Sequence, residues 1–576
     1  MDSVDSGKKA GYESIRLSVM KWLLLPLIIY AAYLICGIVS HTFSDALIPN
    51  EYREGANVFM TMELLKGNNP YSLDALKGEV PPMIYLYGPL YSIVTGALGG
   101  LLSLLGVSTD LVLLHYGVTF FCIIFSAFIA FLMVREKTGS GTLSLAAFVF
   151  LINCSWRYNY VNAVPDSMGL AVMMLILYVV SRKEFKGQEF ICAVLTVAVF
   201  FTKQYYLLVA GTVTGFLFLF KGIKSTVKYL LSFGLIFGAT AFLLNLYCPL
   251  FTTYMLYFAK GPGSGVASKV TRGAVKMTGT QYNIQQIMSL GGIFFMFFLT
   301  ELLTCIFFLV RFIKAFSRMV KSGAGKGKGL AVTFENALKK AGIDRTDVLM
   351  LIHLAVSGIC LTYLGRNDGA YLSYYLELFM PALIIGALLL FHRVFMMAER
   401  GDILPGKRRI AASLLIIYFI LLVGFTAYRS AVRLPVSPLS EKDYEEWAAA
   451  EKTLDENPGD MYLYPLLSYY GIRHDIYVYN TGQPFVVSEK FYKSYHKHPD
   501  KMERYPYAEN IFQSHFDFRE KILEKVRSGD YSVVSYIEGT DEIFDREDLQ
   551  IKYEKQGTYE LRTGRQVWST ELWIRK

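Results

Sequence analysis

The sequence predicts a polytopic α-helical membrane protein with about 11–13 transmembrane helices, followed by a C-terminal soluble α/β domain. Hydrophobic residues make up 53% of the 576 residues and charged residues only 18%, whereas soluble domains carry about 25% charged residues. Long apolar runs continue to about residue 430, and a run of about 18 such residues can span a bilayer as a helix. Residues 436–576 are polar and contain no long apolar run.

The apolar runs define a transmembrane region, which we place at residues 19–430. The first run is too long for the core of a signal peptide and lacks a convincing small-residue cleavage site, so we expect it to remain as a membrane anchor. Residues 1–18 would then form a cytoplasmic N-terminus. The candidate spans lie near residues 19–40, 84–105, 109–134, 141–156, 167–181, 188–202, 205–220, 229–248, 290–311, 348–364, 371–391 and 410–429.

Lysine and arginine residues concentrate in short connections between these runs. Such connections mark the cytoplasmic side, so the opposite connections and residues 436–576 are predicted to be extracytoplasmic. The net charge of +9 lies largely in these connections rather than on a domain face, which argues against a nucleic-acid partner. The basic connections contain Arg182, Lys183, Lys186, Lys221, Lys224, Lys228, residues 311–345, Lys407, Arg408 and Arg409.

The N-terminal part does not fit simple alternation. Basic residues before the first run place the N-terminus inside and the connection 41–83 outside. Three full crossings between residues 84 and 156 would put the next connection inside, against the count from the downstream segments. We therefore expect one of these segments not to cross the membrane fully. The best candidates are the glycine-rich segment 84–105 and the short segment 141–156.

The C-terminal residues 436–576 have the pattern of one small α/β domain with its own core. "DMYLYP" (460–465) and "DIYVYN" (475–480) alternate like strands. "FREKILEKVRSGDYSVVSYIEG" (518–539) predicts a helix that ends at Ser-Gly-Asp and is followed by a strand. The domain contains no phosphate-binding glycine loop. The seven cysteines of the chain all precede it and lack metal-ligand spacing, which argues against a disulfide framework or a zinc site.

The first outer connection, 41–83, is longer and more patterned than an ordinary loop. Val58, Met62 and Leu65 share one helical face, which predicts an amphipathic helix at the membrane surface. Three acids, Asp45, Glu51 and Glu54, lie just before this helix or in its first turn. Acids at a helix start are often plain caps favoured by the helix dipole, so their position alone does not assign a function.

Other charged side chains lie in separate outer connections. Arg157 and Asp166 bracket one short turn, Lys203 ends a short helix, and Arg366 precedes Glu377, which enters the next apolar segment. Asp166 is also in a typical capping position, and Lys203 is a typical snorkelling lysine. Together these residues still place acids and basic side chains that could bind phosphate at one membrane face, where ionisable groups are frequently functional.

This pattern resembles the type C (GT-C) glycosyltransferases, integral membrane enzymes that use polyprenyl-phosphate-linked sugars. The resemblance covers residues 20–430 by layout and is similar to the dolichyl-mannosyltransferase-like branch. It is carried by three stretches: Glu54, Leu64, Leu65, Gly67 and Tyr71 followed by "YLYGPLY" (85–91); Arg157 with Asp166; and Lys203-Gln204 with the segment from Gly365 to Glu377.

The resemblance implies that Glu54 and Asp166 are catalytic, with a first-loop carboxylate acting as general base on the acceptor hydroxyl. Better-known members carry aspartate there, so Asp45 and Glu51 remain alternative acids. Cationic side chains would stabilise the leaving lipid phosphate, and the candidates are Arg157, Lys203 and Arg366. Residues implied to bind substrate are Gln204, Tyr87, Asp368, Tyr374 and Glu377. Some relatives use a divalent metal (Mg or Mn) at paired acids; Glu54 and Asp166 could be ligands, and this is left open.

The expected activity is inverting transfer of a sugar from a polyprenyl-phosphate donor to a glycan or lipid-linked acceptor. It would occur on the extracytoplasmic face of the cell membrane, with the outer connections 41–83 and 249–289 near the site. The main alternative is a transporter or flippase of lipid-linked saccharides, which predicts internal repeats and ionisable groups near the bilayer midplane. A membrane O-acyltransferase would need a catalytic histidine, and a non-catalytic scaffold would only display residues 436–576.

Overall fold

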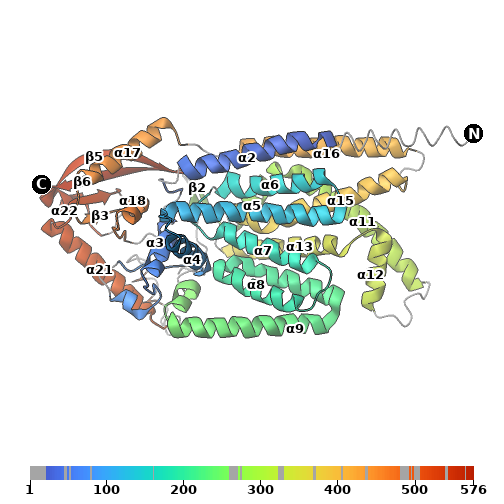
Figure 1. Ribbon diagram of the computed structural model, residues 1–576, viewed down its shortest axis with the longest axis horizontal. Helices are drawn as coiled ribbons and strands as arrows, with labels where there is room; N and C mark the ends of the chain where they lie inside the picture. The colour runs from blue at the N-terminus through green and yellow to red at the C-terminus, as the bar shows by residue number, and fades with distance from the viewer. Residues whose placement is uncertain are drawn as a thin grey trace, which may run out of the picture.

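The computed structural model has two parts, an elongated helical bundle and a smaller C-terminal domain that covers one end of it (Figure 1). We call the covered end the C-domain end and the opposite end, where α2 (Leu24–Ser44) begins, the far end. The described residues are 21–44, 48–50, 54–77, 81–159, 161–257, 270–272, 275–321, 330–367, 372–403, 407–434, 439–479, 492–493, 496–497, 506–538, 543–564 and 566–576.

The bundle consists of long, apolar helices that run between its two ends. In the described ranges, seven helices are long and apolar enough to cross a membrane. Large apolar side chains such as Leu235 and Phe242 are exposed on the bundle surface, as expected where lipid rather than water is the solvent. The helices of the bundle, shorter ones included, are α2 (Leu24–Ser44), α5 (Leu111–Thr138), α6 (Gly141–Asn159), α7 (Asp166–Ser181), α8 (Gln188–Thr202), α9 (Val209–Tyr247), α10 (Gly279–Ile293), α11 (Phe295–Lys321), α13 (Arg345–Asn367), α15 (Met380–Arg400) and α16 (Arg408–Arg433). Helix α12 (Leu330–Ala341) lies at the far end.

Helix α9 contains two of the spans expected from the sequence. At Gly222 the backbone leaves the helical conformation, with φ 77° and ψ −179°. A positive φ favours glycine, so this residue allows the chain to break between the segments expected at 205–220 and 229–248. The basic residues Lys221 and Lys224 lie at this break.

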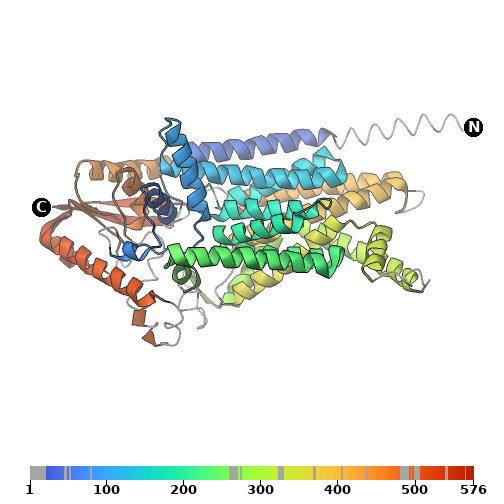
Figure 2. The same ribbon diagram turned by 60° about the horizontal axis from the view of Figure 1, so that its bottom comes forward.

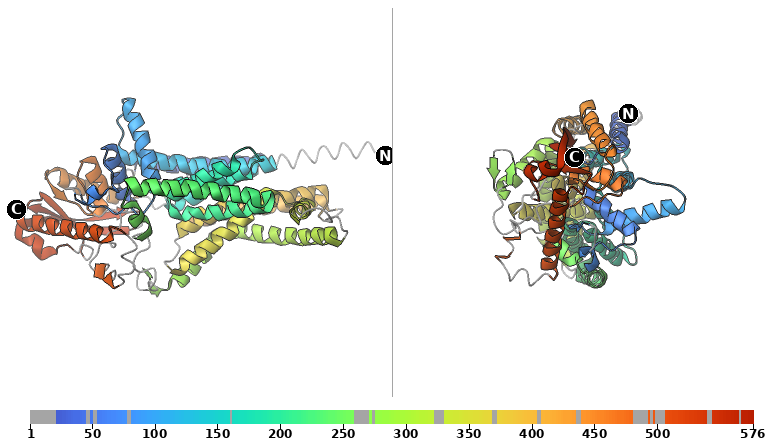
Figure 3. Two further views of the ribbon diagram at one scale, coloured as in Figure 1. Left: turned by 90° about the horizontal axis from the view of Figure 1, so that it is seen from below. Right: turned by 90° about the vertical axis from the view of Figure 1, so that its left-hand side faces the viewer.

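Helix α4 (Leu90–Leu104) explains the parity problem of the N-terminal part. It has only 15 residues and projects sideways from the C-domain end instead of running through the bundle (Figures 2 and 3). Helices α5 and α6 pack along each other within the bundle. Of the two candidate segments, 84–105 is therefore the one that does not run through the bundle, whereas 141–156 forms most of α6.

The helix expected in the first outer connection is α3 (Glu54–Leu65). Every residue from Glu54 to Glu63 is buried, so the exposed polar face expected of an amphipathic helix is wrong, while its position at the membrane surface stays a prediction. Helices α4 and α5 and the short helix α18 (Ser468–Arg473) of the C-terminal domain pack around it. The polar residues Asn57 and Thr61 of α3 hydrogen-bond to protein groups.

The C-terminal domain contains a four-stranded sheet in the order β3-β4-β6-β5. Strand β3 pairs parallel with β4, and the other neighbours pair antiparallel. The predicted helix 518–528 is the second half of α21, whereas 475–479 of the predicted strand "DIYVYN" are irregular. The elements are α17 (Glu441–Asp455), β3 (Met461–Tyr462), η6 (Pro465–Leu467), α18, α21 (Ala508–Ser528), β4 (Val533–Tyr536), α22 (Arg546–Lys552), β5 (Tyr553–Thr563) and β6 (Gln566–Arg575).

Candidate active site

Glu54 begins α3 at the junction of the bundle and the C-terminal domain, and it is fully buried. Its Oε2 atom accepts hydrogen bonds from the Ala163 backbone N–H at 3.1 Å and from the Tyr116 hydroxyl at 3.3 Å. The hydroxyl of Tyr469, the second residue of α18, donates a third hydrogen bond to this atom. Hydrogen bonds to a carboxylate stabilise its charged form, which compensates for burial. A carboxylate therefore lies where three separate parts of the chain meet.

The turn between α6 and α7, residues 161–165, is fastened to α3 and its surroundings. Asn57 Nδ2 donates to the Ala163 carbonyl at 2.9 Å, and Asn50 Nδ2 donates to the Val161 carbonyl at 2.7 Å. Thr119 Oγ1, on α5, donates to the Asn162 carbonyl at 2.7 Å. These bonds satisfy backbone groups of a buried turn, which would otherwise be costly. They also fix the start of α7, where Asp166 lies.

Asp166 forms a buried ion pair with Lys203, which follows α8. The Lys203 Nζ to Asp166 Oδ1 distance is 2.5 Å, and the two residues are 3% and 8% exposed respectively. Tyr206 connects this pair to a third ionisable group, because its hydroxyl lies 2.8 Å from the Asp166 carbonyl oxygen and 3.0 Å from Glu377 Oε2. Glu377 also interacts electrostatically with both Asp166 and Lys203. Two acids and one base therefore share one enclosed volume, and removing a member would leave a buried charge uncompensated.

Glu377 enters this cluster from a distorted helix. Residues Tyr375–Phe379 form the π-helical turn η5 between α14 (Leu372–Tyr374) and α15. Such π-turns interrupt regular helices and are frequent at functional sites. The sequence had singled out Glu377 as an acid within an apolar stretch, and the π-turn is the local structure that holds it there.

Aromatic rings surround the Lys203 ammonium group. The centres of the Tyr87 and Tyr374 rings lie 5.1 Å and 5.2 Å from Nζ, and Tyr205 lies at 5.8 Å. Ring faces attract cations, so the ammonium is held by electrostatics on several sides. The three tyrosines also provide hydroxyl groups and flat faces of the kind that recognise a sugar.

The segment that carries Tyr87 is positioned by two close approaches. Gln204 Nε2 donates to the Leu86 carbonyl at 2.6 Å. Next to Tyr87, a Cβ atom at Gly88 would lie only 1.8 Å from the Phe201 carbonyl oxygen. Only glycine therefore allows this segment to lie against the end of α8, beside Lys203.

The Glu54 carboxylate and the Asp166–Lys203 pair are neighbours. Ala163, which binds Glu54, precedes Asp166 by three residues in the fastened turn. The hydroxyl of Tyr91, at the start of α4, interacts electrostatically with both Glu54 and Asp166. A cavity of about 450 Å3 lies beside the first outer connection, and its lining includes Glu63, Asn69, Met83, Tyr85 and Tyr477. The turn at Ala163 and the Tyr91 hydroxyl thus link Glu54 to the neighbourhood of Asp166, whereas none of Glu54, Asp166 and Lys203 lines this cavity. A shared catalytic site of the three residues stays a prediction.

Comparison with known proteins gives a match at the level of fold. No family model matches the chain, and no curated protein matches it. The crystal structure of ArnT from Cupriavidus metallidurans bound to undecaprenyl phosphate aligns over 96% of this chain and 98% of its own, with a TM-score of 0.53 and 12% identity. The Archaeoglobus fulgidus oligosaccharyltransferase tethered with an acceptor peptide aligns over 95% of this chain and 74% of its own, with a TM-score of 0.47 and 10% identity.

The chain has the GT-C fold. The ArnT alignment covers nearly all of both chains, so it includes the C-terminal domain as well as the bundle. The GT-C fold therefore accounts for the polytopic architecture predicted from the sequence, with its small C-terminal sheet.

Within this GT-C fold, the described contacts of Arg157 differ from its predicted role. Its guanidinium lies 5.8 Å from the ring centres of both Tyr33 and Trp156, and Nη2 donates to the Tyr33 hydroxyl at 3.4 Å. Tyr33 belongs to α2, so these contacts direct Arg157 toward that helix. Within the described residues, no hydrogen bond or ion pair joins Arg157 to Asp166 or Lys203. Packing against two aromatic rings explains where this buried arginine lies, and its role toward a donor phosphate stays a prediction.

Several predicted site residues cannot be placed in the cluster. Asp45, Glu51 and Asp368 lie outside the described residues, as does the side chain of Arg366, of which only the helical backbone at the end of α13 is described. In the described ranges, no group of three or more His, Cys, Asp and Glu side chains could hold a metal ion. Asp166 is neutralised by Lys203, and Glu54 accepts three hydrogen bonds, so this pair does not fit a divalent metal.

Three tyrosines of the cluster had no assigned role in the sequence. Tyr116 and Tyr469 bind Glu54, and Tyr206 binds Glu377. Tyr206 follows Lys203-Gln204 closely and could have been suspected from that position. Tyr469 lies 415 residues from Glu54 and has no local pattern that distinguishes it from the other 39 of the 40 tyrosines in the chain.

Proposed function

We propose that this protein is an inverting glycosyltransferase that moves a sugar from a polyprenyl-phosphate donor to a glycan or lipid-linked acceptor. The observation that carries the proposal is the buried Asp166–Lys203 pair, enclosed by tyrosines and adjoining Glu54, at one end of a GT-C bundle. Burial of three carboxylates and an ammonium in one region is costly and is typical of functional sites in membrane proteins. The ArnT structure was solved with undecaprenyl phosphate, which supports a lipid-phosphate donor.

In the proposed reaction the acceptor hydroxyl attacks the anomeric carbon from the face opposite the lipid phosphate. The new bond joins the acceptor oxygen to that carbon, and the bond between the carbon and the phosphate oxygen breaks. The hydroxyl proton passes to Glu54, and the electron pair of the broken bond leaves with the polyprenyl phosphate. A phosphate is already a good leaving group, so no second carboxyl group is required as an acid.

Lys203 would stabilise the departing phosphate. Its ammonium lies at the centre of the cluster and is preorganised by Asp166 and the tyrosine rings. Preorganised charge directed at a developing anion is a large contributor to catalysis. Asp166 would therefore position Lys203 and balance its charge until the donor arrives. Tyr87 and Tyr374 would contact the sugar beside it.

The Tyr469 hydroxyl must release Glu54 for the carboxylate to accept a proton from substrate. The contact is made by the C-terminal domain, so docking of this domain would control access to the base. The cavity beside Tyr85, Tyr254 and Tyr477 is the space from which an acceptor would approach. The reaction would occur at the C-domain end of the bundle. The positive-inside distribution of Arg182, Lys221 and Arg408 supports an extracytoplasmic location for that end.

Release of free lipid phosphate is the direct test. The purified protein is incubated with a panel of polyprenyl-phosphate sugars and an acceptor mixture, and free polyprenyl phosphate is measured. We expect release with at least one donor and none with Glu54→Gln. A wild-type protein that moves lipid-linked saccharides across vesicle membranes without releasing lipid phosphate would be a transporter, and the proposal would be wrong.

A further inference from the structure

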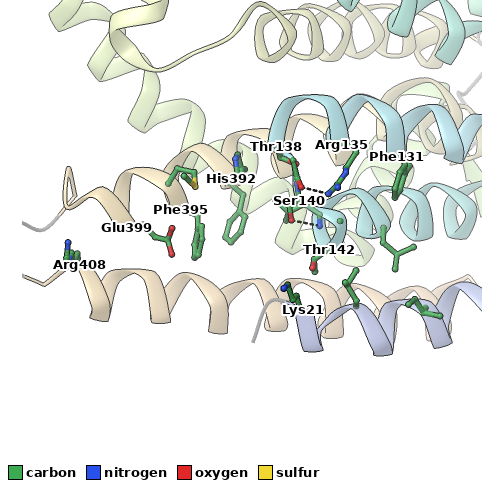
Figure 4. Close-up of a pocket in the computed structure, with 18 of the residues that line it drawn as sticks. Lys21, Phe131, Arg135, Thr138, Ser140, Thr142, His392, Phe395, Glu399 and Arg408 are labelled. Atoms are coloured by element: carbon green, nitrogen blue, oxygen red, sulfur yellow. Dashed lines mark hydrogen bonds between the residues drawn. The ribbon is translucent and has the colours of Figure 1, made fainter. Parts of the chain in front are cut away.

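A second, larger cavity lies at the far end of the bundle, away from the candidate active site. Its volume is about 1070 Å3, which is comparable to sites for sizeable small molecules. It is enclosed by the start of α2, the turn between α5 and α6, and the hairpin of α15 and α16 (Figure 4). The candidate glycosyl-transfer chemistry uses none of its lining residues.

Basic residues are spread along this far-end cavity: Lys21 and Arg135 lie beside Ser140 and Thr142, and Arg408 lies at the opposite end, beyond Phe395 and Glu399 (Figure 4). Lys21, Arg135, Arg408 and Arg409 line the cavity together with a single acid, Glu399, which gives four positive charges against one negative charge. Arg135 is held at the rim because its Nη1 donates to the Gly139 carbonyl. The turn at Gly139 and Ser140 leads directly into α6, and the positive end of a helix dipole adds to the attraction for an anion.

Apolar residues also line the far-end cavity between and beside these basic residues. Leu24 and Ile28 of α2, Phe131 of α5, and Phe391 and Phe395 of α15 contribute to the lining. Ile28 is 53% exposed, and it lies on a helix that is long and apolar enough to span a membrane. A soluble anion would bind the basic rim and leave these surfaces uncovered. A molecule with a negative head group and hydrocarbon chains complements both sets of residues.

We propose that the far-end cavity binds an anionic phospholipid from the membrane leaflet at that end. The phosphate lies between Lys21 and Arg135, and the upper acyl chains lie along Leu24, Ile28 and Phe131. Basic pockets between transmembrane helices bind anionic head groups through the same combination of charge and apolar wall. This inference does not depend on the proposed glycosyl transfer, because it concerns the opposite end of the bundle.

Binding of defined lipids to the full-length protein tests the far-end site. Purified protein in neutral detergent is titrated with phosphatidylglycerol or phosphatidylcholine, and bound lipid is counted by native mass spectrometry. We expect tight retention of phosphatidylglycerol over phosphatidylcholine. The double variant Lys21→Gln/Arg135→Gln should weaken phosphatidylglycerol binding by at least about tenfold, since each basic residue near a membrane surface contributes appreciably to anionic lipid binding.

A matched control removes the same charge elsewhere. Lys224 and Lys314 are exposed basic residues that do not line the cavity, so Lys224→Gln/Lys314→Gln should retain phosphatidylglycerol. Ile28→Trp changes no charge but fills the apolar part, and it should also weaken binding. Equal binding by the cavity and control variants would overturn the site. Preferential binding of undecaprenyl phosphate, lost in both cavity variants, would identify a polyprenyl rather than a phospholipid occupant and overturn the assignment.

Discussion

Charged side chains are buried at one end of the bundle and exposed at the other. At the C-domain end, Asp166, Lys203 and Glu377 are buried and joined to one another by an ion pair and a shared tyrosine. At the far end, Arg135 and Arg408 are exposed at the rim of an apolar cavity. Burying a charged group costs desolvation free energy, whereas a basic side chain that stays exposed at a membrane surface does not have this cost. The difference separates a region organised for chemistry from one organised for contact with lipid.

The comparison leads to unequal expectations for mutation. At the C-domain end each polar group has defined partners, so loss of one group disturbs the others. At the far end the basic groups act mainly through their summed charge, so single changes should have small effects on activity. Four experiments test this difference between the two ends.

The largest effect is expected for Glu54→Gln, which keeps the size of the side chain and removes the proton acceptor. Lipid-phosphate release should fall by about 100- to 10,000-fold, the usual contribution of a general base. The matched control is Glu301→Gln, because Glu301 is also a buried glutamate of the bundle but contacts Cys305 within α11. Release by Glu301→Gln should stay within about threefold of wild type. Full activity of a folded Glu54→Gln protein would remove Glu54 from the site.

The Asp166–Lys203 pair should show strong coupling in a double-mutant cycle. Lys203→Met leaves Asp166 buried without its partner, a change that typically costs about 3–5 kcal/mol. Asp166→Asn should likewise leave an unpaired ammonium. The double variant should be more stable than Lys203→Met alone, as measured by thermal unfolding in detergent, while all three lose donor binding. Additive losses of stability would show that the two side chains do not share one buried environment.

Much of the fold and part of this site were predictable from the sequence. The apolar runs predicted the helical bundle, because the bilayer constrains helices by length, whereas the orientation read from the basic connections stays a prediction. The proximity of Asp166 and Lys203, which form an ion pair, was expected from their positions at one face. Arg157 fits the same pattern equally well, but its described contacts are with Tyr33 and Trp156. A pattern of outer connections does not determine such contacts.

The structure of the C-terminal domain was harder to predict from the sequence where the domain contacts the bundle. The alternating segment "DIYVYN" resembles a strand, yet Asp475 binds Lys66 at 2.6 Å and Tyr477 binds Glu63. These long-range contacts with α3 replace strand pairing, an override of local propensity by tertiary structure. Tyr469 was missed for the same reason, since its role depends on a contact between the two parts of the chain.

Tyr469→Phe tests whether that contact tunes Glu54. The variant removes one donor to the carboxylate and leaves the ring in place. The charged form of Glu54 loses stabilisation, so the acidic limb of the pH profile of kcat/KM should move to higher pH. The control is Tyr470→Phe, because Tyr470 belongs to the same helix but binds Asp455 at 2.8 Å. Identical pH profiles for the two variants would show that Tyr469 only packs against the bundle.

The smallest expected effect is the acid sensitivity of the C-terminal domain. Burial lowers the pKa of His515 to about 3, against about 6.5 in an unfolded chain. Because the unfolded state binds a proton more readily, the stability associated with neutral His515 is present above about pH 6.5 and is lost as pH falls toward 3. Burial opposes ionisation of Glu571, but hydrogen bonds from Lys555, Arg546 and Trp573 outweigh it and lower its pKa, which adds a further loss at lower pH.

Intrinsic tryptophan fluorescence during denaturant unfolding at pH 7.5, 6.5 and 5.5 measures this effect, since Trp447 and Trp573 are buried in the C-terminal domain. The unfolding midpoint should decrease across this range in the wild type. His515→Gln removes the titrating group and should flatten the dependence, whatever its effect on absolute stability. His474→Gln changes an exposed histidine of the same domain and should keep the wild-type slope. If His515→Gln also keeps it, the acid sensitivity arises from groups other than the buried histidine, and the C-terminal domain does not depend on His515 remaining neutral.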